Sequence, residues 1–203
     1  MRKINALALV AGITTLVLIA VSYFIPWWQL TVGNPALATV NFSPLNLNFE
    51  LFNNLLTIPL ILALNVSCLL ALLAGGLILI IYSVVPTKPY ASKLIGYAYK
   101  PPLLAVVLFV IEVVGLTLSV KAFTGFDFPL IGAGTVGLPA GLAPGGISVS
   151  VNVSAAFLWP FYLAIAVTVL CVAARIYHRK ITKVAPSQIP SPPSPSGQLV
   201  ISQ

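Results

Sequence analysis

The segment "ISVSVNVSA", residues 147–155, alternates apolar and small polar residues over eight positions. This period of two is typical of a β-strand with one buried face. The chain around it consists mostly of long apolar runs that indicate helices. The segment therefore decides between a plain helical bundle and a bundle that also carries a sheet.

The composition indicates an integral membrane protein. Of the 203 residues, 59% are hydrophobic and only 6% are charged, whereas soluble domains carry about 25% charged residues. So few charges cannot cover a water-facing surface. The net charge of +7 does not indicate a nucleic-acid partner. The basic residues lie at the ends of apolar runs, without a basic face that contains interleaved aromatic residues.

Four apolar stretches are long enough to cross a bilayer as helices, which takes about 20 residues. We expect a first span in 1–25, a second in 57–85, a third in 102–123 and a fourth in 155–177. The first has the basic start and small residues of a signal peptide, whose cleavage would leave three spans. Its apolar length favours a retained helix. The predicted fold class is a membrane all-α protein, a bundle of four transmembrane helices.

The basic residues predict the orientation. Nine of the ten lie near the two termini or in the connection 86–101, and none lies in 26–56 or 124–154. The positive-inside rule then predicts a multi-pass protein of the cell membrane, with cytoplasmic termini and two outer loops, 26–56 and 124–154. The segment 178–203, basic and then rich in Pro and Ser, is expected to be a disordered tail. Three tryptophans are expected in the outer aromatic belt: Trp27, Trp28 and Trp159.

The first outer loop also alternates, in "LNLNFEL" (45–51) and in the shorter "ATVNFS" (38–43). Because two strands alone are marginal in water, we predict that these segments and the strand 147–154 form one small extracellular β-sheet. The Gly- and Pro-rich stretch 125–146 is expected to be a packed or interfacial loop. The predicted apolar face of the sheet consists of Leu45, Leu47, Phe49, Leu51, Ile147, Val149, Val151 and Val153.

This layout resembles the claudin-type tetraspan arrangement, with four spans, cytoplasmic termini and a sheet shared by both outer loops. Claudins carry a Trp-Gly-Leu-Trp-type signature and two cysteines in the first outer loop. This chain has "PWWQL" at 26–30 and no cysteine there. Tetraspanins have a cysteine-rich second loop, which the chain also lacks. The resemblance therefore implies a topology and transfers no functional residue to this chain.

No residue pattern indicates an enzyme, a cofactor site or a metal site. The sequence has no nucleophile beside a base, no paired carboxylates and no glycine-rich phosphate loop after a strand. The two cysteines, Cys68 and Cys171, lie inside apolar segments, and His178 is expected to be solvated among basic residues. We therefore expect a non-enzymatic protein that binds neither a cofactor nor a metal.

Glu112 is the only acid within a predicted span, and such an acid is a functional candidate by default. It is either a proton or cation relay with Asn65 as a neighbour, or a protonated acid bonded to Asn65, Ser67 or a backbone carbonyl. A transport path usually has more polar groups, which favours the second interpretation. Small residues at helical spacing predict close helix contacts, within the bundle or between copies: Ala63, Ser67, Ala71, Gly75, Gly115 and Ser119.

Two candidate glycosylation sites lie in the outer loops, at Asn41 and Asn152. Asn152 is favoured because Pro44 follows the sequon of Asn41 directly.

Three functions remain open from the sequence. The favoured one is a protein whose outer sheet mediates assembly or contact. Its partner would be a second copy, a subunit of a membrane complex or the cell envelope, and its surroundings the lipid bilayer. The alternatives are a small transporter or proton-conducting subunit that uses Glu112, and an accessory subunit of a membrane enzyme complex.

Overall fold

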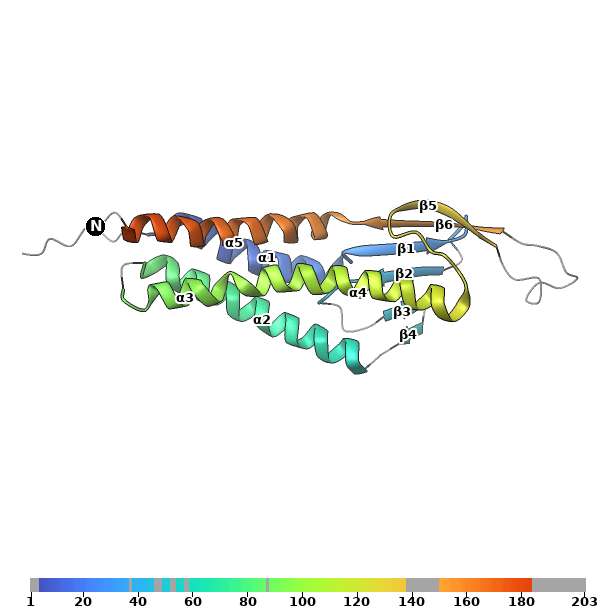
Figure 1. Ribbon diagram of the computed structural model, residues 1–203, viewed down its shortest axis with the longest axis horizontal. Coiled ribbons are helices and arrows are strands. Elements are labelled where there is room, and N and C mark those ends of the chain that lie inside the picture. The colour runs from blue at the N-terminus through green and yellow to red at the C-terminus, as the bar shows by residue number, and fades with distance from the viewer. Residues whose placement is uncertain are drawn as a thin grey trace, which may run out of the picture.

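The computed structural model describes residues 4–36, 38–45, 49–51, 54–56, 59–86, 88–137 and 150–183. The molecule is elongated, with helices along most of its length and a β-sheet at one end (Figure 1). The helices are α1 (Ala6–Phe24), α2 (Pro59–Val84), α3 (Ala91–Ala98), α4 (Lys100–Thr124) and α5 (Trp159–Lys183). The strands are β1 (Trp28–Val32), β2 (Ala38–Phe42), β3 (Phe49–Leu51), β4 (Asn54–Leu56), β5 (Gly132–Gly137) and β6 (Ser150–Phe157).

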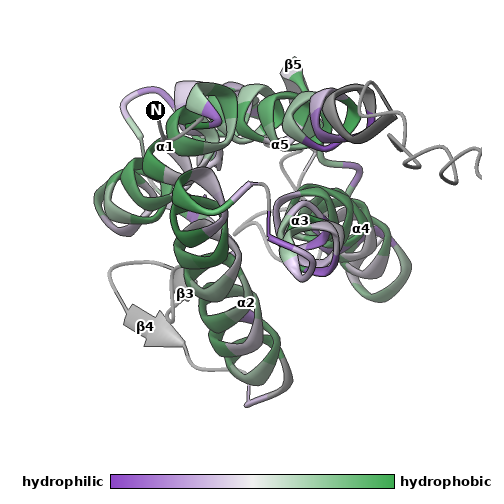
Figure 2. Cartoon of the chain, turned by 90° about the vertical axis from the view of Figure 1, so that its left-hand side faces the viewer, coloured by the Kyte–Doolittle hydropathy of each residue, from purple (hydrophilic) through white to green (hydrophobic). Residues whose placement is uncertain are grey.

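Within the described residues, four helical segments have the length and composition of membrane spans: Ala6–Phe24, Ile61–Val84, Ala91–Thr124 and Trp159–Arg179. The predicted four-helix layout is confirmed at this level. The ribbons of these helices are coloured mostly as hydrophobic (Figure 2), and many of their large apolar side chains are exposed on the single chain. Such a surface is stable in lipid and not in water.

Three predicted boundaries were wrong. The helix α5 continues to Lys183, so residues 178–183 are helical and do not belong to the expected disordered tail. The connection 86–101 contains the helix α3, whose buried Ala91, Ile95 and Ala98 recur at helical spacing. Together α3 and α4 form the third span. The fourth span does not begin at residue 155, because the strand alternation continues to Phe157 and α5 starts at Trp159.

Close backbone contact joins α1 to α2. A Cβ atom on Gly12 would lie only 2.7 Å from Ile80 Cγ1 and 2.9 Å from the Gly76 carbonyl oxygen. Only glycine leaves room for this approach, which is the packing that small residues allow between helices in lipid. The contact uses Gly12 and Gly76, which the predicted stripe of small residues did not include.

The helix α1 also packs against α5, and this neighbourhood explains the sheet. The chain leaves α1 directly into β1, and it enters α5 directly from β6. The two strands therefore continue two adjacent helices of opposite direction. They pair antiparallel, with Leu30 opposite Ala155 and Thr31 opposite Ser154. The prediction that both loops contribute to one sheet is confirmed.

The strand order is β4-β3-β2-β1-β6-β5, and every neighbouring pair is antiparallel. Four strands, β2-β1-β6-β5, form the main part, and the three-residue strands β3 and β4 extend it beyond β2. The sequence did not predict β1, which follows the tryptophan pair, or β5. The "GAGTVG" sequence of β5 has little strand propensity, and its pairing with β6 sets its conformation.

One face of the sheet is apolar and packs around Phe109 of α4. The Phe109 ring is fully buried, and its centroid lies 5.0 Å from Trp27, 5.6 Å from Phe42 and 5.8 Å from Phe161. Phe157 of β6 stacks on Phe161 at 4.4 Å. This aromatic cluster joins the sheet to the helices.

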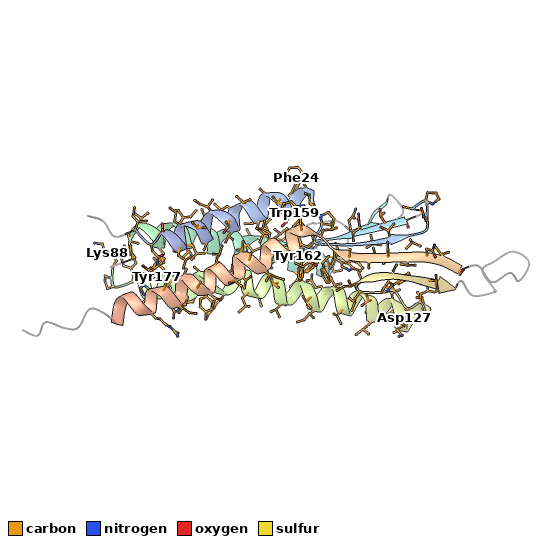
Figure 3. All side chains as sticks on the ribbon, turned by 90° about the horizontal axis from the view of Figure 1, so that it is seen from above. Phe24, Lys88, Asp127, Trp159, Tyr162 and Tyr177 are labelled. Atoms are coloured by element: carbon orange, nitrogen blue, oxygen red, sulfur yellow. The ribbon has the colours of Figure 1, made fainter. Side chains whose placement is uncertain are left out.

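Trp27 and Trp28 belong to this interior, so their predicted place in a lipid-facing aromatic belt was wrong. Both are 0% exposed. The Trp27 indole N–H donates to Ser22 Oγ at 2.7 Å, and that of Trp28 donates to the Leu130 carbonyl at 2.9 Å. A buried indole needs such an acceptor. The exposed aromatic side chains where helices meet sheet are instead Phe24, Trp159 and Tyr162 (Figure 3).

Candidate functional sites

The face of the sheet opposite Phe109 is polar, and the strands β1, β6 and β5 place no charged residue on it. It presents Gln29 and Thr31 of β1, Asn152 and Ser154 of β6, and Thr135 of β5. A hollow of about 750 Å³ lies on this side and is lined by Thr31, Thr135, Asn152 and Ser154, among others. The hydroxyl and amide groups around this hollow can donate and accept hydrogen bonds without the cost of desolvating a charge.

The strand β5 forms an edge of the sheet, since the described strands include none on its outer side. Five of its six residues are exposed, and Val136 is half-buried. Its sequence contains no Pro, Lys or other charged residue. Proteins normally block sheet edges with such residues, because an open edge can pair with another chain.

The residues that were predicted to form the apolar face of the sheet lie in different parts of the structure. Val153 is 1% exposed and Val151 is half-buried in β6. Leu45 is 3% exposed but lies in a turn, where it packs with Leu72 and Ala105. Phe49 and Leu51 belong to β3. The remaining three positions lie outside the described residues: Leu47, Ile147 and Val149.

The outer half of α4 extends beyond the other helices and runs alongside the sheet (Figure 1). Phe109 contacts Trp27, which follows the end of α1, so the fifteen residues from Val110 to Thr124 project about 22 Å further. Leu118 is 61% exposed and Phe123 is 89% exposed on this projection. Its end is linked to the next segment by an ion pair of 2.7 Å between Lys121 Nζ and Asp127 Oδ2.

Glu112 lies on this projection, one turn beyond Phe109, and therefore near the junction of bundle and sheet rather than at the middle of the bundle. Its Oε2 atom is buried and has no hydrogen-bond partner among the described residues. Asn65 is 2% exposed. The Ser67 hydroxyl donates its proton to the Ala63 carbonyl at 2.8 Å, so that proton is not available to Glu112.

The predicted helix-packing residues divide into two groups. Gly75 is buried, and a Cβ atom there would lie 3.2 Å from Pro101 Cγ and 3.3 Å from the Ala98 carbonyl. It thus permits close packing of α2 against the third span, and Ala71 is half-buried nearby. A Cβ atom on Gly115 would meet nothing within 4 Å. The positions that are exposed on this single chain are Ala63, Ser67, Gly115 and Ser119.

A buried hydrogen-bond chain that the sequence analysis missed joins three helices at the end away from the sheet. The Asn5 side-chain amide donates to the Tyr82 hydroxyl at 3.1 Å, and this hydroxyl lies 2.8 Å from His178 Nδ1. Asn5 Oδ1 also accepts from the Ala8 N–H, which caps α1. The Tyr82 hydroxyl therefore bridges Asn5 and His178, and the histidine tautomer decides which group donates in the bond between Tyr82 and His178.

The expectation of a solvated His178 was therefore wrong, because the residue is only 4% exposed. The sequence does indicate a structural role for Asn5, because an asparagine directly before an apolar run is typical of a helix N-cap. It does not indicate the pairing of Tyr82 with His178, because the two residues lie 96 positions apart.

Basic residues gather at the end of the molecule opposite the sheet. Figure 3 shows Lys88 and Tyr177 at that end and Asp127 at the sheet end. Arg175 binds α3 to α5 there: its Nη1 donates to the Ser92 carbonyl at 3.0 Å, and its guanidinium lies 5.8 Å from the centroid of the Tyr99 ring.

The two candidate glycosylation sites differ in their surroundings. Asn152 is exposed beside the hollow on the polar face. Asn41 is half-buried, and its side-chain oxygen accepts a hydrogen bond from Gln29 Nε2 at 2.8 Å.

No protein-family model matches the chain, and no curated protein matches it in sequence. The claudin-type resemblance therefore stands on the four-helix layout and the shared sheet, without support from a family match.

Proposed function

We propose that this chain is a non-enzymatic integral membrane protein whose outer β-sheet mediates assembly or contact. The contact is with a second copy, with another subunit of a membrane complex or with the cell envelope. The observation that carries the proposal is the sheet itself: β1 and β6 continue two membrane helices, so their pairing fixes the sheet rigidly to the bundle. The hydrogen-bonding face and the β5 edge remain exposed.

Aromatic side chains support the placement in the membrane. Phe24, Trp159 and Tyr162 are exposed at the junction of helices and sheet, and Tyr177 is exposed at the other end (Figure 3). Aromatic residues prefer both membrane interfaces. The 19 residues of α1 between these levels span about 28 Å, close to the thickness of a bilayer core. With the basic end in the cytoplasm, the sheet stands outside the cell.

Native mass spectrometry of the protein, gently extracted from its own membrane, tests this proposal. We expect a homo-oligomer or a defined complex. Replacing Thr135 with Arg puts a bulky charge at the exposed β5 edge, on the polar face and away from the apolar face, and we expect the complex to be lost while the chain stays folded. The matched control is Ser92→Arg, an exposed substitution at the opposite end. A wild-type protein that is wholly monomeric would contradict the proposal.

The buried, unpartnered Oε2 of Glu112 favours transport as the second candidate function. A carboxyl group without a fixed partner is able to exchange protons, and its position near the outer junction would place it at the mouth of a path. Reconstitution in liposomes separates the two functions. Transport requires that Glu112→Gln abolish proton flux, whereas the contact function predicts no flux in the wild type and normal assembly of the variant.

A role as an accessory subunit of a membrane enzyme is one form of the contact function. Its partner would appear in the same native mass spectrum as a second chain of fixed stoichiometry.

A further inference from the structure

Among the described strands, β5 forms one edge of the sheet and β4 forms the other. The main strands run roughly along the same axis as the helices (Figure 1). A neighbouring copy that stands in the same membrane and is related to the first by translation can therefore present its β4 edge to the β5 edge of the first.

The number of strands decides which edges can pair. The six described strands alternate in direction, so the first and the last of them, β4 and β5, run in opposite directions. Two copies in one membrane share the same orientation, so β5 of one copy and β4 of the next are antiparallel. Two β5 edges would meet as parallel strands, which pair slightly less stably per residue.

From these strand directions we infer that the chain assembles head to tail within one membrane. In this assembly β5 of each copy pairs with β4 of its neighbour in a continuous antiparallel sheet. The inference rests on the proposed contact function and specifies its partner as a second copy. A heterologous contact of this kind gives either a closed ring or an open row, and not a two-fold dimer.

The composition of the two edges agrees with this pairing. Neither "GAGTVG" of β5 nor "NLL" of β4 contains a charged residue or a proline, so neither edge repels or blocks a neighbouring strand. The number of backbone hydrogen bonds between two copies is limited by the length of β4, which has three residues. Because each backbone hydrogen bond adds little net free energy, the contact depends on the high concentration of copies in a membrane. It is therefore best tested before extraction.

Disulfide cross-linking in the native membrane tests the geometry. One chain carries Thr135→Cys in β5, and a second, differently tagged chain carries Leu55→Cys in β4. Mild oxidation of membranes that contain both is expected to give a mixed dimer, several-fold more abundant than the dimer from either variant alone. The register between copies is not fixed, so separate trials place the cysteine of β5 at Ala133 or at Gly137 and leave Thr135 unchanged. A single chain with both cysteines is expected to give a ladder of trimers and larger species.

Two controls fix the interpretation. Ser154→Cys is exposed but lies one strand inside the edge, so with Leu55→Cys it is expected to give no product. The wild type measures any background from Cys68 and Cys171.

The outcomes separate this inference from the proposed function. A dimer of Thr135→Cys alone that equals the mixed product would overturn head-to-tail assembly in favour of like edges meeting. An oligomer in the native mass spectrum with no β4–β5 product at any position would also overturn it, and would leave the contact function standing. A chain that is monomeric in that spectrum and gives no cross-linked product in the native membrane would overturn both.

Discussion

Replacing Phe109 with alanine is expected to lower the free energy of unfolding by about 3–5 kcal/mol, the usual cost of removing a buried phenylalanine ring. The ring is fully buried between Trp27, Phe42 and Phe161. Its loss leaves a cavity where the sheet meets the helices, and the surrounding aromatic rings are too rigid to fill it. Thermal unfolding in a mild detergent, followed by tryptophan fluorescence, measures the effect.

The same helix offers a matched control for this substitution. Phe123 is 89% exposed, so Phe123→Ala is expected to change the free energy of unfolding by less than about 0.5 kcal/mol. Equal stability of the two variants would show that Phe109 does not hold the sheet to the bundle.

Replacing Tyr82 with phenylalanine is the second large effect that we expect, a loss of about 2–4 kcal/mol. The change removes one hydroxyl and leaves two buried groups, the Asn5 amide and His178 Nδ1, without the bonds it made. Each unsatisfied buried group costs about 1–3 kcal/mol. Chemical unfolding in detergent gives the difference between variant and wild type.

Tyr162→Phe is the matched control, because its ring is 60% exposed on α5. We expect it to be neutral. If Tyr82→Phe were equally neutral, the buried chain from Asn5 to His178 would not contribute to the packing of α1, α2 and α5.

The sequence predicted the helices well because each apolar run extends over enough residues to register in composition alone. It also indicated the strand that ends at Phe157, since Val151 and Val153 alternate with polar residues. It did not indicate β5, because a run of glycine and small residues becomes a strand only through its pairing with β6. Such a pairing is a tertiary effect and leaves no local pattern.

The level of a residue along the bundle axis could not be predicted from the sequence either. Glu112 stands near the middle of α4, which indicated the middle of the membrane. The contact between Phe109 and Trp27 instead places it near the outer junction. Position within a helix equals depth only when all helices begin at the same level, and α4 projects past α1 (Figure 1).

The prediction that Trp27 and Trp28 lie in an aromatic belt was wrong for a related reason. Tryptophans that follow an apolar run are usually interfacial, and Trp159 is exposed at the junction. Trp27 and Trp28 instead find acceptors in Ser22 and in the Leu130 carbonyl, which lies 102 residues from Trp28. With these bonds made, burial of both rings is favourable.

The joining of both loops in one sheet is the basis of the proposed contact function, and one disulfide tests it most directly. Thr31 of β1 and Ser154 of β6 lie opposite each other, and opposite residues have Cβ atoms about 5 Å apart. The double variant Thr31→Cys, Ser154→Cys is expected to form an intrachain disulfide on mild oxidation in membranes. Thr39→Cys with Ser154→Cys should not, because β1 separates the two strands. Cross-linking of the second pair but not the first would contradict the shared sheet.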